Sequence, residues 1–243
     1  MRRNKNRGSS AFRLTEHVAV LTGAGISAES GLSTFRDAGG LWEQFDIEDV
    51  ATPEAWERNR ETVRWFYNQR RRQVLEALPN AAHRALAELE QRCCVSVITQ
   101  NVDDLHERAG SSNVLHLHGS ILEARSAIDS AEVVYLGQQD LTPETTCRHG
   151  YPMRPNVVWF GEPVPAIEKA AELVARADHV LVVGSSLAVY PAASLVGFAE
   201  PGVPLTVVDP DASLHLSGAR VIRKPASAGV PEWVRGFRAA FSI

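Results

Sequence analysis

Short runs of apolar residues, most of them β-branched, alternate along this chain with longer segments of helical spacing. Five runs, each followed by a turn containing Gly, Ser, Asn or Asp, predict buried strands: Val18–Leu21, Val95–Thr99, Val114–Leu117, Val180–Val183 and Leu205–Val208. Strands that alternate with helices are typical of a parallel sheet covered by helices on both faces. The hydrophobic pattern therefore predicts an α/β fold.

Two long connections interrupt this alternation and predict a second, smaller lobe. The first contains Pro53–Leu78, a stretch of helical spacing with apolar side chains available for burial: Trp56, Val63, Phe66, Leu75 and Leu78. The second, Ser120–Asn156, is rich in polar and turn residues and contains the apolar run Val133–Leu136. We expect a small lobe from residues 46–82 and 120–156, a large lobe from residues 11–45, 83–119 and 157–243, and a basic flexible tail at residues 1–10.

Composition and charge narrow the class of protein. The chain has 25 Lys and Arg residues against 29 Asp and Glu residues, a net charge of −4, so no overall positive field attracts nucleic acid or an anionic membrane. The longest apolar run, His179–Tyr190, is interrupted by Gly184 and is shorter than the about 20 residues that span a bilayer. Residues 1–10 lack the apolar core of a secretory signal. The sequence thus predicts no nucleic-acid or membrane partner.

The cysteines point to a reducing compartment. There are three of them, and two, Cys93 and Cys94, are neighbours, so a disulfide framework is improbable. Both precede a predicted strand, and we expect them to be buried as small apolar residues. We therefore expect a cytoplasmic protein.

A glycine-rich turn follows the first predicted strand. Thr22–Ala28 reads T-G-A-G-I-S-A and fits the G-x-G-x-x-A dinucleotide fingerprint, in which glycines let the backbone approach a pyrophosphate at the start of a helix. A tight turn that needs glycine for a positive φ would explain the same residues. The continuation Glu29–Asp37 is not the apolar crossover helix of a dehydrogenase, and no acidic residue ends a second strand about 20 residues later to hold a ribose hydroxyl. The pattern indicates a Rossmann-like nucleotide site that does not serve hydride transfer.

Polar residues also end the next two predicted strands. The stretch Gln100–Asp103 lies at the sheet edge where open α/β folds bind ligands, although the same side chains could cap a helix that starts near Asp104. His116 and His118 are two residues apart and so share one face of the following strand. A histidine at this place is either a structural residue or a general base, because its unperturbed pKa lies near neutrality.

Five motifs, taken in chain order, together resemble those of the sirtuins, a family of NAD-dependent protein deacylases. They are Gly23–Ser27 continuing to Phe35–Asp37, Thr99–Asp103, His118–Ser120, Val157–Glu162 and Gly184–Leu187. The resemblance covers about residues 18–234 and implies one catalytic domain over residues 11–243. It implies NAD contacts at a set of positions in and near these motifs: Gly23, Ala24, Gly25, Phe35, Arg36, Trp42, Gln100, Asn101, Asp103, Gly184, Ser185, Ser186, Asp209 and Ala226. The family usually has Asn at the position of Asp209.

The same resemblance implies a reaction that consumes NAD. The acyl-lysine carbonyl oxygen attacks the nicotinamide ribose as nicotinamide leaves, and Asn101 and Asp103 position the ribose and the carboxamide. His118 is the catalytic base that takes a proton from the ribose hydroxyls. The implied products are free lysine, nicotinamide and O-acyl-ADP-ribose.

Two segments carry the expected substrate contacts. Phe160, Gly161 and Glu162 resemble the family's peptide-binding strand, whose main chain pairs with an extended substrate. Tyr67 and Arg70 are three residues apart in a helical segment, so they present a hydroxyl and a guanidinium together, which can hold a carboxylate. This pair resembles the acyl pocket of class III sirtuins, which remove succinyl and malonyl groups as well as acetyl. The alternative is that this arginine-rich run is a solvated basic face.

The second long connection departs from the family pattern. Sirtuins usually bind a structural zinc there through two Cys-x-x-Cys pairs. Here the first pair falls on Ser126 and Asp129 and the second near Cys147 and His149, which leaves one thiol. We therefore expect no conventional zinc, with a weak site at Asp129, Cys147 and His149 as the alternative. Apolar contacts of Val133–Leu136 are then expected to stabilise the lobe.

The resulting prediction is an enzyme, an NAD-dependent protein lysine deacylase that removes acetyl and succinyl or malonyl groups from proteins or peptides. A mono-ADP-ribosyltransferase would need the same cleavage of NAD with a different acceptor. A catalytically silent protein that binds NAD or acyl-lysine is a third hypothesis, disfavoured because His118, Asn101 and Asp103 are all present.

Overall fold

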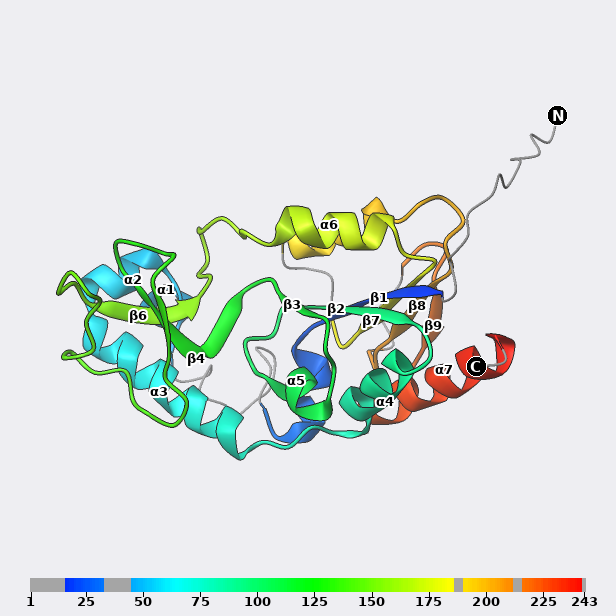
Figure 1. The fold of residues 1–243 in the computed structure, drawn as a ribbon, viewed down its shortest axis with the longest axis horizontal. Coiled ribbons are helices and arrows are strands. Elements are labelled where there is room, and N and C mark those ends of the chain that lie inside the picture. The colour runs from blue at the N-terminus through cyan, green and yellow to red at the C-terminus, as the bar shows by residue number, and fades with distance from the viewer. Residues whose placement is uncertain (1–15, 33–44, 186–189, 212–215, 242–243) are drawn as a thin grey trace.

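Six parallel strands form the larger sheet of the computed structural model, which describes residues 16–32, 45–185, 190–211 and 216–241 (Figure 1). Their spatial order is β3-β2-β1-β7-β8-β9. The strands are β1 (His17–Thr22), β2 (Cys94–Thr99), β3 (Val114–His116), β7 (His179–Val183), β8 (Leu205–Val208) and β9 (Arg220–Ile222). The five predicted strands and the Rossmann-like α/β class are confirmed. The pattern missed β9, whose three residues are too few to show a buried run.

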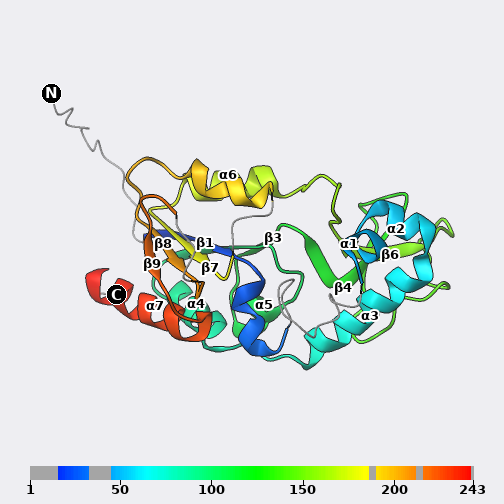
Figure 2. The ribbon, with the colours of Figure 1, turned by 180° about the vertical axis from the view of Figure 1, so that it is seen from behind.

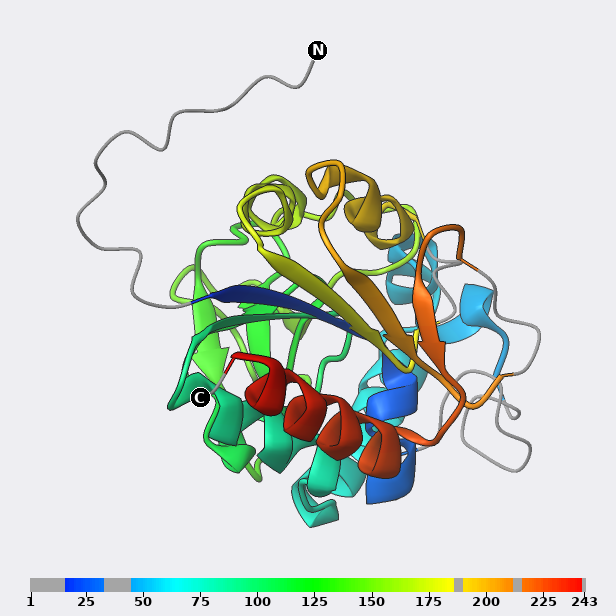
Figure 3. The same ribbon diagram turned by 90° about the vertical axis from the view of Figure 1, so that its right-hand side faces the viewer.

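Alternate residues of β1 face opposite layers of helices. Val18 and Val20 belong to one buried cluster, with side chains from two helices on one face of the sheet, and Ala19 and Leu21 belong to a second cluster on the other face. Figures 1 and 3 show these two layers on either side of the strands. The first layer contains α4 (Ala81–Glu90) and α7 (Ala226–Phe241), and the second contains α6 (Ile167–Ala175) and the 3-10 helix η4 (Ala192–Phe198). Burial on both faces explains the near-continuous apolar runs of the strands.

A smaller antiparallel sheet, in the order β5-β4-β6, packs with three helices beside the larger one (Figures 1 and 2). Its elements are α1 (Ile47–Val50), α2 (Pro53–Arg58), α3 (Arg60–Glu76), β4 (Gly119–Ser126), β5 (Val133–Tyr135) and β6 (Met153–Val157). The predicted helical stretch is divided at Asn59, whose side chain accepts a hydrogen bond from the Thr62 N–H and so starts a new helix. The sheet itself was not predicted, because β4 and β6 carry charged residues and a proline. The two-lobe boundaries drawn from the sequence stay a prediction.

Burial in this lobe corrects part of the sequence prediction. Trp56, Val63 and Phe66 are buried as expected, but Leu78 is 73% exposed because α3 ends two residues before it. In the run Val133–Leu136 only the last residue is buried, and Tyr135 is 72% exposed. β5 lies at the edge of its sheet, so its three residues stay exposed, and of the expected apolar contacts only those of Leu136 form, in a buried cluster with Ala124, Leu141, Cys147 and Met153.

The cysteines are all free thiols, with Cys93 and Cys147 buried. Cys94 is exposed, contrary to expectation, because it opens β2 at the end of the sheet. Within the described ranges, no helix combines the length and the apolar character needed to cross a membrane.

Candidate active site

Two glycine-containing turns meet where the strand order reverses. The carboxyl ends of the neighbouring strands β1 and β7 form this switch point, at which open α/β sheets bind ligands. The Gly23 N–H donates to the Val183 carbonyl at 3.1 Å, and the Gly25 N–H donates to the Gly184 carbonyl at 2.9 Å. A Cβ on Gly25 would lie 2.7 Å from the Gly184 Cα, and Gly184 itself has a φ of 57°. The turn and the fingerprint interpretations thus apply together, because the glycines bring the two loops together at the predicted nucleotide site.

Ser27 joins the two predicted polar residues that follow β2. Its hydroxyl donates to Asp103 Oδ2 at 3.1 Å and accepts from Asn101 Nδ2 at 3.1 Å. Asp103 Oδ1 also accepts the Leu105 N–H at the start of α5 (Leu105–Ala109), so the helix-capping role weighed from the sequence is confirmed for Asp103. Sequence reasoning gave Ser27 no role, although its place in the glycine-rich motif was a signal.

Asn101 and Asp103 are both buried. Burial raises the pKa of Asp103, and the hydrogen bonds from Leu105 and Ser27 oppose this rise. Gln100 Nε2 donates to Ser185 Oγ at 3.0 Å, which links the ends of β2 and β7 across the carboxyl end of β1. Four of the predicted cofactor residues, Gln100, Asn101, Asp103 and Ser185, therefore form side-chain hydrogen bonds at the same end of the sheet as the glycine turns.

The pKa values of the two histidines near the end of β3 shift in opposite directions. His118 Nδ1 bonds the Gln100 carbonyl at 2.9 Å, and since a carbonyl only accepts, Nδ1 carries the proton and Nε2 has the lone pair. Burial lowers the pKa of His118 despite that bond, so the ring is neutral near pH 7. His116 is held on both nitrogens, by the Asn101 carbonyl at 3.0 Å and by Glu107 Oε1 at 2.8 Å. Burial opposes its protonation, but these bonds outweigh burial and raise the pKa of His116. His118, with its lowered pKa and its Nε2 lone pair, is therefore the better candidate for a base, because both ring nitrogens of His116 are already bonded.

The remaining predicted cofactor residues fall in two groups. Asp209 follows β8, where its carboxylate accepts the Asp211 N–H at 2.9 Å, and Ala226 opens α7 in the same buried cluster as Ile26 of the glycine turn. The others lie outside the described residues: Phe35, Arg36, Trp42 and Ser186.

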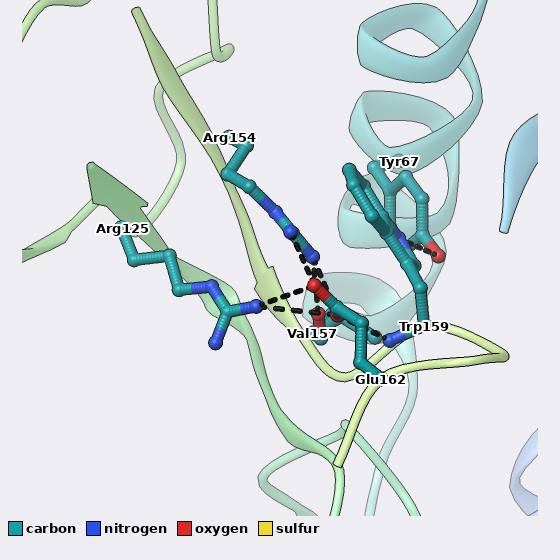
Figure 4. A network of polar contacts seen from close by, with 6 residues as sticks. All are labelled: Tyr67, Arg125, Arg154, Val157, Trp159 and Glu162. Carbon is teal, nitrogen blue, oxygen red and sulfur yellow. Dashed lines mark hydrogen bonds and ion pairs between the residues drawn. The ribbon is translucent and has the colours of Figure 1, made fainter. Parts of the chain in front are cut away.

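The predicted acyl pair lies on α3. Tyr67 is 2% exposed, and the Trp159 indole N–H donates to its hydroxyl at 2.9 Å (Figure 4). Burial raises the pKa of Tyr67 to about 12, so the hydroxyl stays protonated. Arg70 is half-buried, and burial lowers its pKa while the Tyr67 side chain and the negative charge of Asp103 oppose that shift. Arg70 thus lies within electrostatic reach of Asp103, one of the predicted cofactor residues.

The arginine-rich run around Arg70 is not a solvated face. Arg71 is 1% exposed and donates to the Ile121 carbonyl and to Asn68 Oδ1. Arg72 is the exposed member, and it pairs with Asp140. The three arginines point to different surroundings because successive residues of a helix lie about 100° apart.

The segment predicted as a peptide-binding strand is a turn. Phe160 is exposed and its N–H donates to the Ala51 carbonyl, while Gly161 has a φ of 86°. The Glu162 carboxylate accepts the bidentate guanidinium of Arg154 at 2.7 and 2.9 Å, and Arg125 at 3.2 Å (Figure 4). Burial raises the pKa of Glu162, but these bonds outweigh it and lower the pKa overall. The Glu162 carboxylate is therefore occupied by contacts within the protein. Peptide contact at this turn stays a prediction.

The residues at the expected zinc position do not fit that metal. Ser126 Oγ accepts the N–H groups of Ile128 and Asp129, and a hydrogen bond with Ser126 lowers the pKa of the Cys147 thiol. Asp129 pairs with the Arg148 guanidinium. Within the described ranges no three His, Cys, Asp or Glu side chains converge as metal ligands. One thiol and a carboxylate paired with a cation do not make a four-ligand thiolate site.

Comparison with known proteins gives consistent matches. A model of the Sir2 family matches residues 23–191. An NAD-dependent protein deacylase of Helicobacter pylori is 52% identical over 202 residues, covering 83% of this chain and 88% of the relative. One of Bacteroides thetaiotaomicron is 48% identical over 226 residues, covering 89% and 96%.

Solved structures agree with the sequence matches. A Sir2 homologue in complex with NAD superposes with a TM-score of 0.84 at 40% identity, covering 93% of this chain and 91% of that one. A mutant Sir2 homologue in complex with ADP-ribose superposes with a TM-score of 0.86 at 39% identity, covering 94% of each chain.

Proposed function

This chain belongs to the Sir2 family, and we propose that it is an NAD-dependent protein lysine deacylase with acylated proteins or peptides as substrates. The observation that carries the proposal is the pairing of a neutral His118, whose Nε2 lone pair is available, with the Asn101–Ser27–Asp103 cluster at the switch point. The relatives named NAD-dependent protein deacylase and the Sir2 complexes with NAD and ADP-ribose support NAD as the consumed co-substrate. Three free thiols are compatible with a cytoplasmic location.

The loops at the switch point offer groups that suit a dinucleotide. The Gly23 and Gly25 N–H groups are used between the two loops, whereas the Ala24 N–H has no acceptor within the described residues and suits a phosphate oxygen. Gln100, Asn101 and Ser185 add amide and hydroxyl groups for ribose hydroxyls and a carboxamide. NAD would supply the glycosidic bond that breaks and the ribose that receives the acyl group.

In the proposed reaction His118 would transfer a proton, and Asn101 and Asp103 would orient the substrate. His118 Nε2 accepts a proton from a ribose hydroxyl, and its Nδ1–H bond to the Gln100 carbonyl keeps the ring in the correct tautomer and orientation. Asn101 and Asp103, fixed by Ser27, orient the sugar so that the acyl-lysine oxygen approaches on one side while nicotinamide leaves. NAD, acyl-lysine and one water molecule together give nicotinamide, deacylated lysine and O-acyl-ADP-ribose.

We further propose that the acyl pocket accepts succinyl and malonyl groups besides acetyl. A protonated Tyr67 hydroxyl and the Arg70 guanidinium lie on one face of α3 and would act as a donor pair for a carboxylate. Arg70 is also within electrostatic reach of Asp103, which follows β2.

One experiment tests both levels of the proposal. Nicotinamide release from NAD is measured on acetyl-lysine and succinyl-lysine versions of one peptide, with wild type and the double variant Tyr67→Phe, Arg70→Met. We expect wild type to act on both, and the variant to lose about 100-fold on the succinyl peptide, for two charge-assisted bonds, but little on the acetyl peptide. Equal losses would remove the acyl-pocket assignment, and no nicotinamide from either peptide would remove the deacylase assignment. ADP-ribose attached to the peptide or protein would indicate ADP-ribosyl transfer instead.

A further inference from the structure

We infer that Trp159 is a positioning residue that turns the Tyr67 hydroxyl into a donor for acidic acyl groups, and this inference rests on the proposed acyl specificity. Trp159 lies in the turn after β6, and Tyr67 lies on α3, 92 residues away in the sequence (Figure 4). Both side chains are buried, with Trp159 3% exposed. The Trp159 indole N–H donates to the Tyr67 hydroxyl oxygen at 2.9 Å.

The chemistry of the indole fixes the direction of this bond. Indole nitrogen is a donor with no lone pair to offer, so the Tyr67 oxygen must be the acceptor and its own proton is not used between the two rings. A hydroxyl whose oxygen accepts one bond donates the next more strongly, because hydrogen bonds in a chain polarise one another. The Tyr67 proton is thereby directed to a further acceptor, and a carboxylate next to Arg70 is such an acceptor.

Three contacts prevent the Trp159 ring from turning away. Its backbone N–H donates to Glu162 Oε2 at 2.8 Å, which anchors the turn. The Arg154 guanidinium carbon lies 3.3 Å from the indole centroid, stacked on the ring, and Arg154 is itself held by the bidentate pair with Glu162. The ion-paired turn therefore places the indole N–H that holds Tyr67 (Figure 4).

The effect of Trp159 should depend on the acyl group. An acetyl group has no carboxylate to accept from Tyr67, so deacetylation does not need the direction of this hydroxyl. A succinyl or malonyl group does need it. A residue that merely supported the fold would affect both reactions alike.

The test compares kcat/KM on succinyl-lysine and acetyl-lysine peptides within one preparation, so that the fraction of folded enzyme cancels in the ratio. Trp159→Phe keeps an aromatic ring beneath Arg154 but removes the N–H, and we expect the succinyl-to-acetyl ratio to fall about tenfold, the effect of one hydrogen bond. Trp56→Phe is the matched control. Trp56 is buried in the same cluster, its ring centroid is 6.0 Å from that of Trp159, and its indole N–H has no partner within the described residues. We expect its ratio to stay within twofold of wild type.

A double-variant cycle separates action through Tyr67 from a general effect. In a Tyr67→Phe background, Trp159→Phe should leave the ratio unchanged, because the hydroxyl through which it acts is already gone. A Tyr67-dependent ratio that Trp159→Phe does not alter would overturn this inference and leave the acyl pocket in place. A wild type without activity on the succinyl peptide would instead overturn the proposed acyl specificity, and the inference with it.

Discussion

The two lobes contain different kinds of buried ionisable pair. In the large lobe His83 and His106 lie against each other with ring centroids 4.9 Å apart, and burial lowers the pKa of His83 to about 4 and that of His106 well below its usual value. In the small lobe Arg154 is buried as a cation against the Glu162 carboxylate. A neutral buried ring retains a lone pair that can take a proton, whereas a buried ion pair serves to hold neighbouring groups in place. This contrast fits the roles that we propose above, in which a neutral ring, His118, takes a proton and the ion-paired turn holds the acyl pocket.

The largest expected effect tests the neutral histidine of the site. His118→Ala should lower deacylation of both acetyl and succinyl peptides about 1000-fold, since it removes the group whose lone pair takes the ribose proton. His116→Gln is the matched control, because Gln keeps a donor for the Asn101 carbonyl, and its loss should be under tenfold. Turnover measured by nicotinamide release decides between them. Similar losses in both variants would mean that the opposite pKa shifts of the two histidines do not identify the base.

The next largest effect tests the ion pairs of Glu162 in the small lobe. Glu162→Gln removes the carboxylate that neutralises Arg154 and Arg125, so the free energy of unfolding should fall by about 3 kcal/mol. Glu123→Gln is the control on the same sheet, since Glu123 accepts from the neutral Asn156 amide and from no cation among the described residues, and it should lose under about 1 kcal/mol. Denaturant titration measures both values. If the two variants lost the same amount, the ion pairs would not be what holds the turn.

A third effect concerns acid pH. The unfolded chain protonates His83 near pH 6.5, whereas the folded protein does so only near 4, so stability is complete above 6.5 and declines as the pH falls toward 4. Each pH unit in this window should remove about 1.4 kcal/mol for His83, with His106 adding to the loss. The pKa of Glu162 is lowered, so its contribution is complete above its ordinary value of 4.5 and is lost as the pH falls further, which places most of its loss at lower pH than that of His83.

His83→Gln isolates the histidine contribution. Gln at this third position of α4 can still reach the Asn80 N–H that His83 Nδ1 accepts. The slope of stability against pH between 6.5 and 4 should be smaller in this variant. An unchanged slope would show that another group controls acid unfolding.

The sequence was most informative where one local pattern determines the structure. β1 is apolar because both its faces are covered, so its position and the polar edge that follows it could be predicted. β6 contains Arg154 and Pro155 and resembles a loop, because its charged residue is buried only through a partner eight residues later in the chain. Ser27 and Trp159 act through neighbours that are 76 and 92 residues away, and their partners become evident only when the chain is folded.

The smallest expected effect is at the expected zinc position of the small lobe. A chelator such as EDTA should leave the thermal unfolding midpoint unchanged, since the Arg148 guanidinium already occupies the neighbourhood of Asp129 and Glu132 and only Cys147 could supply a thiolate. Arg148→Ala should lower stability by under about 1 kcal/mol, because its side chain is largely exposed to solvent that screens both ion pairs. Metal analysis of the purified protein completes the test. One zinc per chain, together with a midpoint that EDTA lowers, would mean that a metal and not this hydrogen-bonded arrangement holds the lobe, and its charged interior would then need a different explanation.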